Sequence, residues 1–120
     1  MNLKYNSIGP SYYKLEGDKV SPCRDKSEIK LPHRFLSTTV FYGNYEVRVS
    51  TVFLSLDHDF TCSGEPVLFE TMSFCEQIPS EVFQIERRYR SYDEAVEGHN
   101  EAILEAVKMV FQCWNLNEIL

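Results

Sequence analysis

Several signatures of well-known protein classes are missing from this sequence. None of its apolar runs approaches the roughly 20 residues needed to span a bilayer, and its first residues, MNLKYNSIGPSYYK, lack the apolar core of a signal peptide. There is no Walker or dinucleotide-binding glycine motif and no G-x-S-x-G nucleophile elbow. These absences predict a cytoplasmic protein that has no membrane contact and no cofactor.

Cysteine is sparse and scattered. Cys23, Cys62, Cys75 and Cys113 form no C-x-x-C pair and no cysteine–histidine spacing of the zinc-ribbon kind. This spacing favours free, mostly buried thiols in a reducing compartment. A zinc site assembled from distant cysteines is the alternative that the sequence leaves open.

Positive charge is also in short supply. The chain has 12 lysines and arginines against 18 aspartates and glutamates, which gives a net charge of −6. Arg87, Arg88 and Arg90 form a compact basic cluster, but Glu86 and Asp93 flank it. Because binding to a phosphate backbone needs clustered basic residues, we predict a solvated strand face here and no nucleic-acid partner.

What the sequence does contain indicates a folded protein. With 120 residues and 43% apolar residues it predicts a single domain over residues 1–120. Alternating runs rich in valine, threonine and aromatic residues predict strands, and Gly17 and Gly43 suit tight turns between neighbouring runs. The predicted strands lie in residues 12–23, 37–43, 45–56, 66–74 and 84–90.

One helix is predicted near the C-terminus. Ser91 and Glu94 match the capping box that begins a helix. Apolar residues and His99 then recur on one face as far as Trp114, at the helical period. The sequence therefore predicts an α+β domain in which a long amphipathic helix, residues 91–114, packs on one face of a mostly antiparallel sheet.

Four stretches carry a resemblance to a known family. They are YYKLEGDKVSPC, RVSTVFLSLDHDF, PVLFETMSF and YRSYDEAVEGH, which together span Tyr12 to His99. In these words the chain resembles a family of small uncharacterised proteins from bacteriophage and bacterial genomes. The usual family form has glycine where this chain has Ser55. Between Phe74 and Arg88 this chain is longer and more polar than the family form. The resemblance implies a phage setting and no particular activity.

Residues that can carry chemistry are concentrated at the end of a predicted strand. Asp57, His58 and Asp59 can bind a divalent metal, and Glu70 and His99 are further candidates for acid–base work. One hypothesis is therefore a small metal-dependent hydrolase or nuclease. Its metal ligands would be Asp57, His58 and Asp59, and its catalytic residues His58, Glu70 and His99.

A structural interpretation of the same residues is the one we favour. Asp57 or Asp59 would accept backbone N–H groups where the strand leaves the core. If Leu56 paired with Val67, Glu70 would lie opposite Phe53 and would need a partner, for which His99 and His58 are the first candidates. His99 would then be a core histidine that donates to a backbone carbonyl or to Glu70.

The outer side of the predicted helix suggests a binding surface. Asp93, Glu97, Glu101 and Glu105 recur every four residues, and Leu104 and Phe111 lie at the edge of the same face. Like charges at this spacing repel, so the stripe does not serve helix stability. This side of the helix is either an ordinary solvated face or a binding surface. In the second case we expect a non-enzymatic protein that binds a host protein or a second copy of itself.

Overall fold

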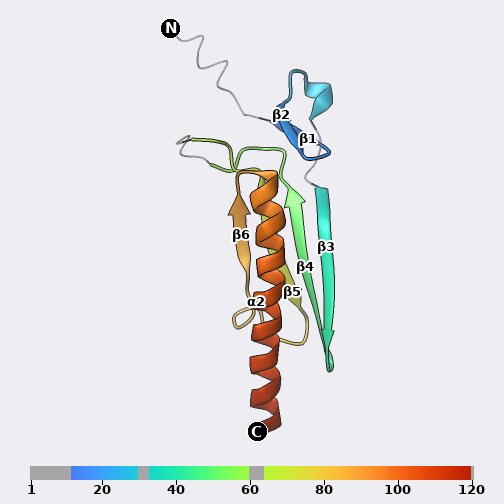
Figure 1. The fold of residues 1–120 in the computed structure, drawn as a ribbon, viewed down its shortest axis with the longest axis vertical. Helices are drawn as coiled ribbons and strands as arrows, with labels where there is room; N and C mark the ends of the chain where they lie inside the picture. Colours follow the sequence, from blue (N-terminus) through green and yellow to red (C-terminus); the bar gives the residue numbers. More distant parts are fainter. Residues whose placement is uncertain (1–11, 30–32, 60–63, 120) are drawn as a thin grey trace.

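The computed structural model describes residues 12–29, 33–59 and 64–119. Two short strands, β1 (Tyr13–Glu16) and β2 (Lys19–Pro22), precede a 3-10 turn, η1 (Lys26–Glu28). The main body consists of β3 (His33–Tyr42), β4 (Tyr45–Phe53), β5 (Phe69–Cys75), β6 (Glu86–Tyr89) and the helix α2 (Tyr92–Ile119) (Figure 1). The chain is an α+β protein, as the sequence predicted.

The strands form two antiparallel sheets. One has the order β3-β4-β5-β6 and the other contains β1 and β2. Gly43 turns the chain between β3 and β4 at φ 60°, and Gly17 does so between β1 and β2 at φ 65°. Both glycines adopt the left-handed conformation that other residues resist, so both predicted hairpins are confirmed.

The helix α2 begins at the predicted capping box. The Ser91 hydroxyl accepts a hydrogen bond from the Glu94 backbone N–H at 3.1 Å, and Glu94 accepts from the Ser91 N–H at 3.2 Å. The helix continues to Ile119, past the predicted end at Trp114, because no glycine or proline follows to stop it. Among the described residues, no helix combines the length and apolarity that crossing a membrane requires.

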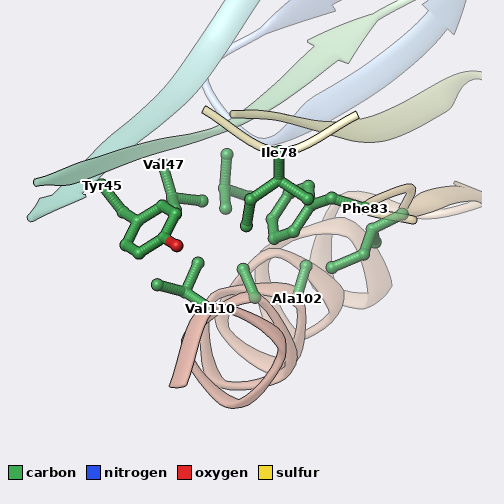
Figure 2. Packing of buried hydrophobic residues seen from close by; sticks show 9 residues of the cluster. Tyr45, Val47, Ile78, Phe83, Ala102 and Val110 are labelled. Atoms are coloured by element: carbon green, nitrogen blue, oxygen red, sulfur yellow. The ribbon is translucent and has the colours of Figure 1, made fainter. Parts of the chain in front are cut away.

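One face of the four-stranded sheet is covered by α2, as predicted (Figure 1). Alternate residues of β4, among them Val47 and Val49, point toward the helix and are buried. In the core between the layers, Tyr45, Ile78 and Phe83 pack with Ala102 and Val110 of the helix (Figure 2). The opposite face of the sheet has no helix over it within the described chain.

Small residues on the inner side of α2 bring the helix close to the sheet. Ala95, Ala102 and Ala106 are fully or almost fully buried. A Cβ atom on Gly98 would lie only 2.2 Å from ring atoms of Tyr89 on β6. The helix therefore needs a residue without a side chain at position 98 in order to pack at this distance.

The predicted pairing of Glu70 with Phe53 is wrong by one residue. Glu70 pairs with Val52, while Phe53 pairs with Phe69. The regular ladder ends at Leu54, and Ser55 beyond it has a positive φ of 67°, so the pairing does not continue evenly to Leu56. Because side chains alternate between faces, this difference moves Glu70 to the face away from the helix.

We predict that Gly98→Ala destabilises the protein although alanine is the better helix former. The added methyl group would overlap the Tyr89 ring, and overpacking of this kind outweighs a gain in helix propensity of about 1 kcal/mol. The expected net loss is about 1–2 kcal/mol in urea unfolding. Asn100→Ala, on the exposed side of the same turn, is the control and should not destabilise.

Candidate functional site

The Asp57-His58-Asp59 segment is a structured exit from the sheet. The Asp57 carboxylate accepts hydrogen bonds from the backbone N–H groups of Asp59 at 2.8 Å and Val67 at 2.9 Å. His58 donates from Nδ1 to the Leu56 carbonyl at 2.7 Å. The segment thus satisfies backbone groups on both sides of the loop, as the structural interpretation predicted for the aspartates.

Asp59 makes an ion pair that the sequence did not suggest. Its carboxylate, only 7% exposed, lies 3.0 Å from the Arg90 guanidinium. The same guanidinium donates to the backbone carbonyl of Glu65. Arg90, which lies just before the start of α2, therefore bonds residues on both sides of the loop, Asp59 and Glu65.

Glu70 is satisfied by an arginine and not by a histidine. Its carboxylate accepts from Arg88 Nε at 3.0 Å, between neighbouring positions of β5 and β6. The expectation that His99 or His58 would be its partner is wrong. The register explains this, because Glu70 and Arg88 are cross-strand neighbours on the face opposite the helix.

His99 lies in a buried polar cluster on the helix side of the sheet. Its Nδ1 is 2.6 Å from the Thr51 hydroxyl and its Nε2 is 2.9 Å from the Thr38 hydroxyl. Thr51 in turn contacts the Thr71 hydroxyl at 2.6 Å. The predicted core histidine therefore bonds threonines on the sheet, and not a carbonyl or Glu70.

Burial lowers the pKa of His99 below its usual range. The side chain is 3% exposed and both ring nitrogens have hydroxyl partners. Enclosure of this kind disfavours the charged form of the imidazole, and both of its ring nitrogens already contact hydroxyl groups of the sheet. The geometry gives His99 a structural role, which links α2 to β3 and β4.

The hypothetical catalytic residues are not brought together. Glu70 lies on the face of the sheet away from α2, whereas His99 is a residue of α2 that contacts the opposite face, so the sheet separates the two side chains. Residues 12–29, 33–59 and 64–119 contain no group of three or more histidine, cysteine, aspartate or glutamate side chains arranged to hold a metal ion. The geometry required by the hydrolase hypothesis is absent from this part of the chain.

The three arginines of the basic cluster form ion pairs with carboxylates of the same chain. Arg87 pairs with Glu105 of α2, Arg88 with Glu70 and Arg90 with Asp59. All three arginines thus have carboxylate partners, which reduces their capacity to bind phosphates.

The cysteines whose positions are described, Cys23, Cys75 and Cys113, are free and partly buried. Cys62 lies outside the described residues.

The outer side of α2 remains as a candidate binding surface. Asp93, Glu97 and Glu101 are exposed, and so are Leu104 (67%) and Phe111 (46%). Glu105 differs from them because its carboxylate is paired with Arg87. We call Asp93, Glu97, Glu101, Leu104 and Phe111 the outer helix face.

Comparisons with protein-family models, with curated proteins and with solved structures find no match for this chain. Function therefore has to be inferred from the chain's own geometry.

We predict that Asp57→Ala lowers stability by about 1–3 kcal/mol, because two partly buried N–H groups lose their acceptor. Asp57→Asn keeps an acceptor oxygen and should lose less. Thermal unfolding measures the stability of both variants.

We also predict that Mn²⁺ or Zn²⁺ leaves the wild-type melting temperature unchanged. A rise of several degrees that His58→Ala abolishes would instead establish a metal site, because a ligand that binds only the native state stabilises it.

The lowered pKa of His99 predicts a loss of stability in acid. Below the ordinary histidine pKa of about 6.5 the unfolded chain takes up a proton that the folded chain does not, so the free energy of unfolding falls as the pH falls. The contribution is at most about 1.4 kcal/mol per pH unit. Urea unfolding at pH 7.5 and 5.5 should show a smaller loss for His99→Gln than for the wild type.

Proposed function

We propose that this chain is a non-enzymatic binding protein, encoded by a phage, that acts on a host protein in the host cytoplasm. The outer helix face is the observation that carries the proposal. The setting comes from the resemblance to small phage and bacterial proteins. A counter-defence role, in which the protein occupies a basic groove of a host enzyme, fits both.

The charge pattern of the outer helix face favours a basic partner. Glu97 and Glu101 are four residues apart and exposed, with Asp93 one turn before them. Carboxylates at this interval stand about 6 Å apart and repel by a few tenths of a kcal/mol. This spacing is close to the interval between phosphates along a nucleic-acid strand. A groove that binds such a strand is therefore a suitable receptor.

Exposed apolar side chains on the same face favour a protein partner. Leu104 and Phe111 follow the acidic residues along the helix, and two-thirds of the Leu104 side chain is exposed. The rings of Phe111 and Tyr42 make an edge-to-face contact with 5.9 Å between their centroids, and Phe111 is 46% exposed. Apolar groups beside charged ones are the usual composition of a protein–protein interface.

The rival proposal, a metal-dependent hydrolase or nuclease, lacks such support. His58, Asp59 and Glu70 have structural partners of their own, and His99 lies on the other side of the sheet from Glu70. No observation on the described residues favours this activity over binding.

We predict that a tagged wild-type protein captures a specific protein from a bacterial host lysate, and that Glu97→Lys/Glu101→Lys does not. The two substitutions reverse the charge of the outer helix face. Capture by the wild type should weaken as salt increases, because exposed charges are screened. Quantitative mass spectrometry of the captured proteins is the measurement.

The matched control is Glu16→Lys/Asp18→Lys, which makes the same change in net charge on the exposed β1–β2 hairpin. It should capture the same protein as the wild type. Equal capture by all three forms would assign binding to another surface, and no specific capture by the wild type would contradict the proposal.

A further inference from the structure

The face of the four-stranded sheet opposite α2 is a second outward surface, which we call the open face. Its side chains alternate with the buried ones, so Glu46 and Arg48 of β4 lie on it between buried Tyr45, Val47 and Val49. Of the described elements, α2 is the helix that packs on the sheet, and it lies on the other face (Figure 1).

Apolar groups are gathered on the open face. Phe41 of β3 is 71% exposed and Phe74 of β5 is 42% exposed. Val52 and Met72 are half-buried and, with Phe74, form the apolar part of a depression of about 330 Å³, whose other lining residues are Arg34, Arg48, Ser50 and Glu70. An outward sheet face in water usually carries polar side chains, so these aromatic groups indicate a surface that another molecule covers.

The charges of the open face nearly cancel although the chain carries −6. Arg34, Arg48 and Arg88 give +3, and Glu46, Glu70 and Glu86 give −3. Glu76, which lines a depression with Glu46, Arg48 and Phe74, brings the sum to −1. Arg88 is neutralised locally by Glu70. Among the described residues, Arg34, Arg48 and Glu46 have no ion-pair partner, so both signs remain available.

We infer that the open face is the interface of a homodimer in which two copies pack sheet against sheet. A two-fold interface places the same patch on both partners, so the patch must contain groups that complement each other. Glu46 and Arg48 lie two residues apart on one strand, about 6.7 Å along it. A two-fold axis between them sets Arg48 of each copy against Glu46 of the other.

The remaining contacts of the patch suit the same partner. The Arg48 guanidinium lies over the Phe74 ring, 4.9 Å from its centroid, and stays available on its outer side. Phe41 is the cross-strand neighbour of Glu46, so the most exposed aromatic group flanks the charged pair. An apolar centre with satisfied charges around it is the usual anatomy of a protein interface.

Other occupants fit less well. A phosphate backbone requires net positive charge, which the open face lacks. The outer helix face of another copy is acidic and would leave Glu46 without a partner. A second open face provides both signs and apolar groups, and the two acidic helix faces then point outward on opposite sides of the dimer.

The test is the oligomeric state of the full chain, measured by sedimentation velocity at protein concentrations up to about 1 mM. This range detects a dimer with a dissociation constant of about 1 mM or lower, which corresponds to a binding free energy of about −4 kcal/mol. The wild type should show a concentration-dependent dimer. Phe74→Asp should weaken the dimer at least about tenfold, or 1.4 kcal/mol. Leu104→Asp, an equivalent change on the outer helix face, should leave it unchanged. Circular dichroism confirms that each variant is folded.

A charge exchange tests the reciprocal pair and keeps the experiment decisive. Glu46→Arg and Arg48→Glu should each be monomeric alone, and an equimolar mixture of the two should form a heterodimer. A wild type that stays monomeric overturns the inference. Loss of the dimer in Leu104→Asp also overturns it, because that result requires contact through the helix. Capture of a host protein by Phe74→Asp tests the proposed function separately.

Discussion

The close approach of α2 to the four-stranded sheet is the constraint on which the other features depend. Small residues on the inner helix face let the backbone come close enough for His99 to reach Thr38 and Thr51 on two neighbouring strands. A larger residue at Gly98 would overlap the Tyr89 ring, and a shift of the helix to relieve this overlap would move His99 away from the sheet. Because the imidazole would then lose its hydroxyl partners inside the core, packing and hydrogen bonding stabilise the same arrangement.

The alternation of side chains across the sheet determines which polar groups can act together. Thr71 and Glu70 are adjacent in sequence, yet Thr71 joins the cluster around His99 while Glu70 bonds Arg88 on the open face. A register different by one residue would exchange them. The separation of Glu70 from His99 is therefore a consequence of strand pairing, and the polar residues on each side have to be interpreted separately.

Much of the fold could be predicted because its signals are local. The capping box at Ser91 and the turn at Gly43 depend on residues a few positions apart. The partners of Glu70 and Asp59 could not be predicted, because they depend on how distant strands align. Ser55 has a left-handed backbone, and this conformation marks where the strand pairing becomes irregular.

A two-layer protein has two outward surfaces, and here they differ in charge. The outer helix face is acidic, so two copies repel each other there. The open face carries both signs in nearly equal number, so it can pack against the same face of a second copy. Self-association and partner binding therefore need not compete for one surface. A dimer joined through its sheets would present two acidic helices on opposite sides. A partner with two basic grooves at a matching distance would bind such a dimer more tightly than a monomer, because it would contact both helices at once.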